Sequence, residues 1–205
     1  FVYAVGGNGD CMGGANVNPM NCFEFASLSA DGKTLGTWTA GMQNLQSPRA
    51  VFGLAAGENS NASQIPAGTA YLFATGGIGA TSELEAAKIL AGGQLEASVV
   101  LGPPMGSKPG PRNGHGLQLV NNAMYLIDGV GGTAAMGTPL NSTQFSVDFG
   151  TPVPQRTSFS NSAATMVIGR WRHATVLTSG FFYLIGGSTN GGLSDATNTI
   201  EQTIF

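Results

Sequence analysis

One phrase recurs four times along this chain of 205 residues: an apolar run that contains a tyrosine and leads to paired glycines. The tyrosines are separated by 68, 54 and 58 residues. Self-similarity at such a spacing predicts an array of one supersecondary unit, in which each copy buries its apolar faces against its neighbours. The four copies are Tyr3 with Gly6 and Gly7, Tyr71 with Gly76 and Gly77, Tyr125 with Gly131 and Gly132, and Tyr183 with Gly186 and Gly187.

The composition favours an extracellular or cell-envelope β-protein over a cytosolic helical enzyme. Charged residues make up only 9% of the chain, against about 25% in typical soluble domains, whereas 42% of the residues are hydrophobic. The net charge of −3 and the scattered Lys and Arg residues do not provide the positive stripe that nucleic acid requires. No apolar run is long enough for a membrane-spanning helix.

The two cysteines, Cys11 and Cys22, flank a loop rich in Gly, Asn and Pro. Ten residues between two neighbouring strands allow the Cα atoms to approach within the roughly 4.4–6.8 Å that a disulfide requires. We therefore expect a disulfide, which would imply an oxidising compartment and a secreted protein. Two unrelated free thiols are the alternative.

Each unit contains four segments that are typical of strands. The tyrosine run is one of them, and the glycines that follow it allow positive φ and close approach of backbones. Second strands are predicted at Asn21–Ser27, Glu83–Leu90, Gln144–Asp148 and Thr199–Phe205. Hairpin turns at Asp31-Gly32 and Gly92-Gly93 then predict third strands at Thr34–Thr39 and Gln94–Val99.

The remaining segment begins with an arginine after a crossover, at Arg49, Arg112 and Arg170, and His115 and His173 each lie ten residues before a tyrosine. The order Arg-x-x-His, Tyr-x-x-Gly-Gly and a hairpin that ends near Trp38 resembles the kelch repeat over nearly the whole chain. The resemblance is weakest at residues 149–168, where no tryptophan matches Trp38. That region is expected to be an irregular strand or an insertion.

The resemblance implies an all-β fold, a kelch-type β-propeller whose four-stranded blades surround a central channel. The predicted strands amount to about three and a half blades, in approximate units 1–48, 49–111, 112–169 and 170–205. Kelch propellers usually have about six or seven blades, and an open arc exposes apolar faces and strand edges. We therefore expect a piece of a larger propeller, with completion of the ring by another chain as the alternative.

The repeated polar residues favour structural roles. The two histidines recur at one position, and no third ligand at a matching spacing supports a zinc site. In kelch domains the repeated arginine joins blades by binding backbone carbonyls and loop acids. Arg156 and Arg172 have no counterparts in the repeat, so they are the better candidates for a function specific to this protein.

No catalytic, cofactor-binding or metal-binding residue is predicted. Asp10 and Asp128 carry oxygens that calcium accepts, but no regular acidic loop surrounds them. The glycine pairs lack the βαβ context of a nucleotide-binding motif. The polar segment 57–69 is expected to be a surface loop, the kind of place where a rigid scaffold binds its partners.

The leading hypothesis is a non-catalytic extracellular or envelope module that binds a protein or glycan through its loops. A structural component of a surface assembly is one alternative. A carbohydrate-active enzyme, resembling sialic acid mutarotases or copper-dependent galactose oxidase, is another. The oxidase would need Tyr and His ligands and a Tyr–Cys crosslink, whereas here every tyrosine belongs to a repeat strand and both cysteines to one loop.

Overall fold

The secondary structure is all β, as the sequence predicts. The computed structural model describes residues 1–11, 18–58, 69–80, 83–101, 109–120, 123–132, 137–147, 159–190 and 195–204. None of these residues belongs to a helix. The described part of the chain accordingly has no helix that could span a membrane.

Fourteen of the sixteen strands in the described residues form four antiparallel sheets, in which strands adjacent in sequence are adjacent in space. The first sheet contains β1 (Val2–Val5), β2 (Phe23–Ala26) and β3 (Thr39–Ala40). The second contains β4 (Gly53–Glu58), β5 (Ala70–Thr75), β6 (Leu84–Lys88) and β7 (Val99–Leu101). The third contains β9 (Gly116–Val120), β10 (Ala123–Ile127), β12 (Ser142–Val147) and β13 (Ser160–Thr165). The fourth contains β14 (Ala174–Thr178), β15 (Phe181–Ile185) and β16 (Ile200–Ile204), and a separate pair is formed by β8 (Arg112–Asn113) and β11 (Val130–Gly131).

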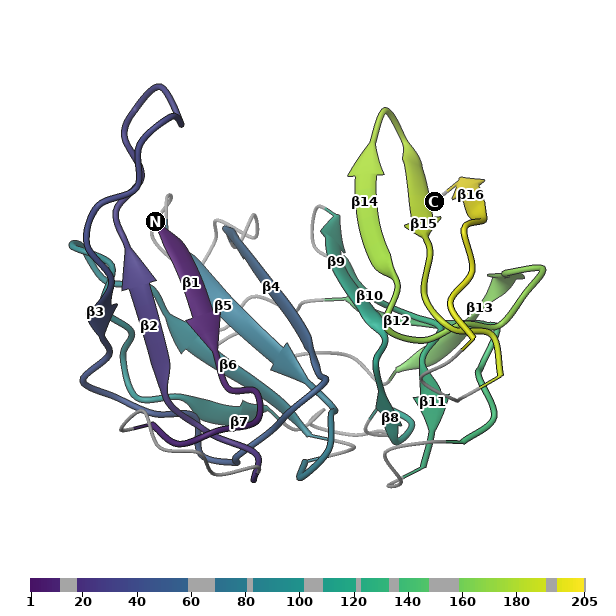
Figure 1. Cartoon of the computed structure of the whole chain (residues 1–205), viewed down its shortest axis with the longest axis horizontal. Coiled ribbons are helices and arrows are strands. Elements are labelled where there is room, and N and C mark those ends of the chain that lie inside the picture. Colours follow the sequence, from purple (N-terminus) through teal and green to yellow (C-terminus); the bar gives the residue numbers. More distant parts are fainter. Residues whose placement is uncertain are drawn as a thin grey trace.

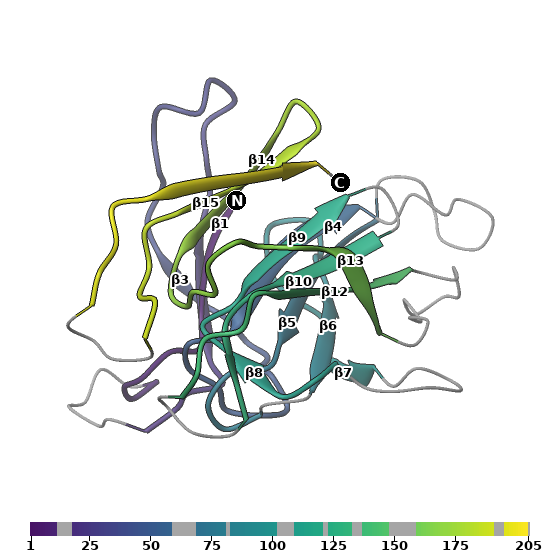
Figure 2. The same cartoon turned by 90° about the vertical axis from the view of Figure 1, so that its right-hand side faces the viewer.

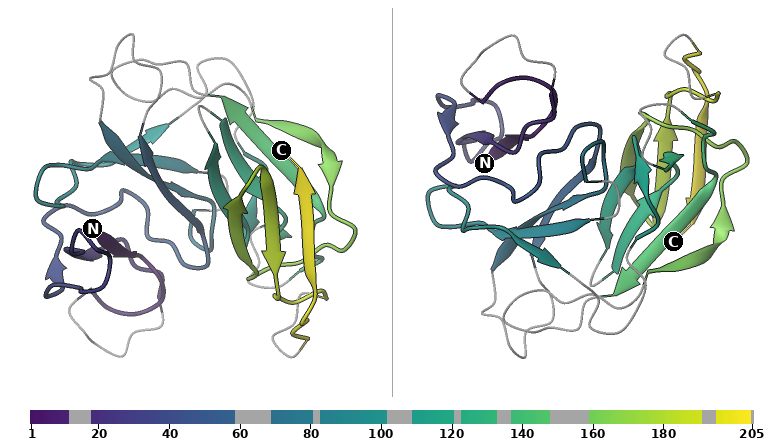
Figure 3. Two further views of the ribbon diagram at one scale, coloured as in Figure 1. Left: turned by 90° about the horizontal axis from the view of Figure 1, so that it is seen from above. Right: turned by 90° about the horizontal axis from the view of Figure 1, so that it is seen from below.

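The four sheets follow one another in chain order across the molecule (Figures 1 and 3). An apolar core lies between each sheet and the next. Phe25 of the first sheet packs in a cluster with Leu72 of the second. Phe73 of the second sheet clusters with Leu126 of the third, and Tyr125 of the third packs against the cluster that contains Phe182 of the fourth. The repeat thus buries one sheet face against the following sheet.

The predicted second strands overlap β2, β6, β12 and β16. β13 lies within the region 149–168, for which the sequence predicts either an irregular strand or an insertion. Residues 148–158 and 59–68 lie outside the described residues, so most of the predicted loop 57–69 does as well.

The third strand begins later than the sequence predicts. β3 starts at Thr39, whereas Leu35 forms only an isolated bridge with Leu28. Leu35 and Thr39 are four positions apart in the sequence, but their partners Leu28 and Phe25 are three positions apart. The extra residue on the returning strand is a β-bulge, which interrupts the ladder.

The second sheet repeats this bulge at the equivalent place. Leu95 and Val99 are four positions apart in the sequence, and their partners Ile89 and Ala86 are three positions apart. The predictions Thr34–Thr39 and Gln94–Val99 were therefore wrong in their bounds, because strand propensity does not reveal a shift in pairing register.

Two hairpins extend toward the same end of the molecule (Figures 1 and 2). One connects β2 to β3 and the other connects β14 to β15. The first is closed by Ser29 and Asp31, whose side chains hydrogen-bond at 2.6 Å. The second turns through Ser179 and Gly180, both with positive φ, as a tight hairpin requires.

Candidate functional site

Each tyrosine strand, or its equivalent, ends in a two-residue turn in the left-handed region. The first residue has a φ of 55°, 57°, 56° and 68° at Gly6, Gly76, Asp128 and Gly186, and the second has 100°, 93°, 96° and 87° at Gly7, Gly77, Gly129 and Gly187. The third copy therefore uses Asp128 and Gly129, which corrects the alignment of Gly131 and Gly132 with the other pairs. Aspartate is one of the few non-glycine residues that enter this region readily. Asp128 can therefore take the place of the first glycine, and a search for glycine pairs does not find it.

The turns also correct the alignment of one tyrosine. Tyr3, Tyr125 and Tyr183 lie three residues before their turns, but Tyr71 lies five residues before Gly76. Phe73 occupies the equivalent place. Because an offset of two residues keeps a side chain on the same face of a strand, Tyr71 and Phe73 belong to the same core cluster.

The second residue of each turn joins one sheet to the next. The amides of Gly7, Gly77 and Gly129 each donate a hydrogen bond of 2.9 Å to the carbonyl of Arg49, Arg112 and Arg170, respectively. A parallel series links the sheets near the start of their first strands. There the Gly114 amide donates to Val51 and the Arg172 amide donates to Gly114, both at 2.7 Å.

Replacing Gly77 by alanine is expected to destabilise the protein by about 3 kcal/mol or more. Its φ is +93°, and a Cβ there would lie 2.6 Å from the Phe52 Cβ and 2.8 Å from the Ala50 carbonyl oxygen. Gly92→Ala is the matched control, because Gly92 has a φ of +88° with no atom within 4 Å of an added Cβ. In urea denaturation the control should lose only about 1 kcal/mol of the free energy of unfolding, which is the cost of holding alanine at a positive φ. Equal losses at the two sites would contradict the close packing of Gly77.

The three repeated arginines are buried side chains that tie two sheets together. Arg49, Arg112 and Arg170 are each no more than 2% exposed. One guanidinium nitrogen of each donates to the turn of its own sheet, at the carbonyls of Gly76 (3.0 Å), Asp128 (3.1 Å) and Gly186 (3.0 Å), respectively. Because the carbonyl of the same arginine accepts from the preceding sheet, each arginine bonds to two sheets at once.

A glutamate on the second strand completes the arginine's surroundings in two of the sheets. Glu85 pairs with Arg49 in the second sheet, and Glu201 pairs with Arg170 in the fourth. The third sheet has Gln144 at this position, so Arg112 donates instead to carbonyls, including that of Ser142 at 3.3 Å. Burial without a paired carboxylate lowers the pKa of Arg112 to about 10, although Asp128 nearby opposes the shift.

The same carboxylates hold the crossover that leads to the arginine. Glu85 accepts hydrogen bonds from the amides of Gln46 at 2.7 Å and Ser47 at 3.1 Å. Glu201 accepts from the Val167 amide at 2.9 Å, and Gln144 accepts from the Gly110 amide at 2.9 Å. Sequence spacing does not reveal this position, because the loops before it differ in length. The available signal was a Glu or Gln on each second strand: Glu24, Glu85, Gln144 and Glu201.

The two histidines occupy one position, directly before β9 and β14, which Phe52 occupies before β4. His115 contacts the preceding sheet, with its Nε2 2.7 Å from the Thr75 hydroxyl. Gly53 provides the space, since a Cβ there would lie 2.6 Å from that nitrogen. Burial and the nearby arginines lower the pKa of His115 well below its usual value and that of His173 to about 4. Both rings are therefore neutral near pH 7.

Asp128 is a fully buried carboxyl group at the turn of the third sheet. Burial raises its pKa to about 8, against the opposing effect of Arg170 and Arg112. The side chain is therefore mostly protonated at neutral pH and is a poor calcium ligand. Within the residues that the structure describes, no three His, Cys, Asp or Glu side chains are placed to hold a metal ion.

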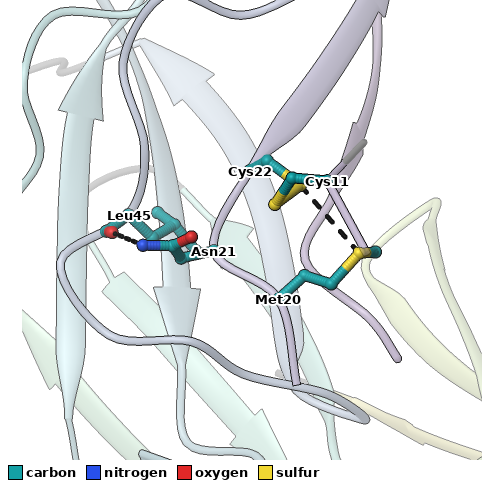
Figure 4. The surroundings of a disulfide bond; sticks show 5 residues. All are labelled: Cys11, Met20, Asn21, Cys22 and Leu45. Carbon is teal, nitrogen blue, oxygen red and sulfur yellow. Dashed lines mark hydrogen bonds between the residues drawn. A yellow bond between two sulfur atoms is a disulfide. The ribbon is translucent and has the colours of Figure 1, made fainter. Parts of the chain in front are cut away.

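A pocket of about 490 Å³ adjoins the first sheet, and its lining includes Ala4, Gly6, Asp10, Glu24 and Met42. Cys11 and Cys22, which also line it, form the predicted disulfide, with their Cα atoms 5.7 Å apart (Figure 4). Met20 lies beside this bond, its sulfur 3.9 Å from that of Cys22 (Figure 4). The side-chain amide of Asn21 donates to the Leu45 carbonyl at 3.0 Å and connects this corner to the following crossover (Figure 4).

Exposed apolar side chains gather at two places. Four of them lie on the fourth sheet: Val176, Ile185, Ile200 and Ile204, at 42–69% exposure. Another four lie on or beside the hairpin between β2 and β3: Leu28, Leu35, Trp38 and Met42. Trp38, the tryptophan of the repeat motif, is 44% exposed.

Of the two arginines outside the repeat pattern, Arg172 is exposed and its guanidinium carbon lies 4.3 Å above the ring of the buried Trp171. Arg156 lies outside the described residues. The structure thus brings the three repeat arginines and two histidines into the interfaces between sheets. It does not bring them together around a pocket among the described residues.

Comparison with known proteins adds no assignment, because no protein-family model matches the sequence and no curated protein is significantly similar to it.

Proposed function

We propose that this chain is a non-catalytic interaction module, a kelch-type β-propeller or part of one, that works outside the cytoplasm and binds a protein or glycan. The disulfide and the low charge support the location. The bonding of the repeated arginines supports a structural role for them, since their donors are directed at carbonyls and glutamates of the scaffold.

The observation that carries the proposal is the exposed apolar face of the fourth sheet. In the third sheet the equivalent face is covered, and the Tyr125 ring lies 5.2 Å from that of Phe182 in the fourth sheet. In the fourth sheet, cross-strand pairs such as Ile185 with Ile200 and Phe181 with Ile204 continue the same face. Ile200 and Ile204 are 63% and 69% exposed. A contiguous apolar surface of this kind favours association with another protein surface.

The propeller architecture gives that surface a specific use. A further sheet, from the rest of a propeller or from another chain that completes the ring, would cover it as the fourth sheet covers the third. The exposed hairpin with Trp38 is a second place for a partner, since aromatic side chains are enriched among residues that dominate binding energy.

The test is a double variant, Ile200→Asn with Ile204→Asn, which makes this face polar while changing two exposed positions. The wild-type chain, immobilised and exposed to cell-envelope proteins and a glycan array, is expected to retain a specific partner that the variant retains at least about tenfold less well. Ser179→Asn, an exposed hairpin position that already has a positive φ, is the control and should bind like the wild type.

Equal retention by the wild type and the double variant would contradict the role of this face. The enzyme alternatives have their own readouts. Faster interconversion of sialic acid anomers in an NMR assay, or copper-dependent oxidation of a sugar alcohol, would overturn the non-catalytic assignment. Formation of filaments by the purified chain would instead favour a structural component of an assembly.

A further inference from the structure

We propose that the pocket of the first sheet binds an arginine side chain, carried by an extended polypeptide segment that pairs with the edge of β1 that no strand of the described residues covers. The inference rests on the proposed function as an interaction module and names one of its sites and the chemistry of its ligand. It follows from the internal repeat, because the equivalent places in the second and fourth sheets each hold a buried arginine.

The carboxylate of the site is Glu24. In the second sheet Glu85 lies opposite Ala74, two residues before the turn, and in the fourth Glu201 lies opposite Leu184, again two residues before the turn. Glu24 lies opposite Ala4, two residues before Gly6. Glu24 therefore stands where Glu85 and Glu201 pair with their arginines. Its own side chain is exposed and forms no hydrogen bond or ion pair with any other described residue.

Two backbone carbonyls complete the acceptor set. Arg170 donates to the carbonyls of Gly186 at 3.0 Å and Thr199 at 3.3 Å. Within each turn the first amide donates to the residue that carries the second carbonyl, from Gly186 to Thr199 in the fourth sheet and from Gly6 to Cys22 in the first. Gly6, Cys22 and Glu24 all line the pocket. They present the three acceptors that bind a guanidinium elsewhere in the chain.

The strand edge beside the pocket has the matching shape. β1 pairs only with β2 in the described residues, whereas β5, β10 and β15 each pair on their other side with β4, β9 and β14. Each of those outer strands begins four residues after its arginine. A segment that pairs with β1 in the same register would deliver an arginine into the pocket, which is a β-strand addition with a side-chain anchor.

The chemistry selects arginine over lysine. Glu85 and Glu201 bind both a guanidinium and a crossover amide, from Ser47 in one case and from Val167 in the other. A planar guanidinium reaches a carboxylate and two carbonyls together, whereas an ammonium is a point charge. Asp10, which also lines the pocket, adds negative charge that favours a cationic ligand.

The probe is a labelled peptide with the sequence of residues 45–58. It contains Arg49, the strand β4, and the amides of Gln46 and Ser47 that donate to Glu85 in the second sheet. Fluorescence anisotropy with the full chain is expected to show binding that weakens at least about tenfold when the peptide arginine is replaced by glutamine. Glu24→Gln in the protein should weaken the wild-type peptide to the same extent. The peptide with glutamine should bind the Glu24→Gln variant and the wild-type protein with the same low affinity. Because Glu24 is exposed, the thermal unfolding of the variant is expected to be unchanged.

Several results would overturn the inference: no peptide binding, binding that does not depend on the arginine, or binding that does not depend on Glu24. Free L-arginine competing as well as the peptide would remove the role of the β1 edge. Self-association of the chain that is lost in Glu24→Gln would identify a second copy as the occupant instead. The Ile200→Asn with Ile204→Asn variant should bind the peptide normally, so failure at this site and failure of the proposed function are separable.

Discussion

Arg49→Met is expected to cost about 3–5 kcal/mol of the free energy of unfolding. The side chains of Arg49 and Glu85 are both fully buried and paired with each other. Removing the guanidinium leaves a buried carboxylate without its counter-charge, as well as the Gly76 carbonyl without its donor. The sheet-to-sheet connection through the Arg49 side chain would also be lost. Urea denaturation at pH 7 measures the change.

The chain contains its own control for this prediction. Arg112→Met removes the equivalent side chain from the third sheet, where Gln144 stands in place of the glutamate. That variant removes one donor from each of three carbonyls, those of Leu126, Asp128 and Ser142, but leaves no carboxylate of a lost ion pair. The expected cost is therefore lower, about 1–3 kcal/mol. Glu85→Gln combined with Arg49→Met should recover part of the larger loss. Equal costs for the two arginines would show that the carboxylate contributes little.

Asp128→Asn is expected to abolish the fall in stability between about pH 6.5 and pH 8 in the wild type. The folded pKa of Asp128 is raised to about 8 by burial, whereas an exposed aspartate titrates near pH 4. The folded state therefore binds the extra proton between these values, and its stabilising effect is lost as the pH rises through 8. Across this interval of about 1.5 pH units the wild type should lose about 2 kcal/mol of its free energy of unfolding, and the variant should not. Asparagine keeps the left-handed backbone accessible.

The histidines produce the opposite slope at lower pH. Burial depresses the pKa of His173 to about 4 and holds that of His115 well below its usual value. An unfolded chain takes up these protons from about pH 6.5 downward, so stability falls as the pH decreases from 6.5 toward 4. The charged groups that act on Asp128 are Arg170, Arg112 and Glu201. The wild type should therefore be most stable near about pH 6.5.

Urea denaturation at pH 5, 6.5 and 8 measures both changes in stability. Asp128→Asn should remove the fall in stability above pH 6.5 and keep the fall below it. His173→Phe, which copies Phe52 of the second sheet, should reduce the fall below pH 6.5 and keep the one above it. A wild-type stability that is constant between pH 6.5 and pH 8 would contradict a buried, protonated Asp128.

The sequence alone predicted the β class, the second strands and the disulfide. Apolar runs, glycine pairs and hairpin turns are local signals, and local backbone preferences express them directly. The same signals placed His115 and His173 at one repeat position, directly before β9 and β14. They failed where one residue substitutes for another in the same conformation, as Asp128 does for glycine and Phe73 does for tyrosine.

Only the tertiary structure identified the glutamate position of each sheet and the bulge before β3 and β7. The loop between a turn and its glutamate differs in length from sheet to sheet, and sequence spacing carries no information about a pairing that forms across such a loop. A register shift likewise depends on which residues of two strands meet, not on the preference of either strand. Gly6 is far from Cys22 and Glu24 in the sequence, and only the folded chain brings the three together in the lining of one pocket. A guanidinium site is made by groups converging in space, and that convergence is a property of the packed chain.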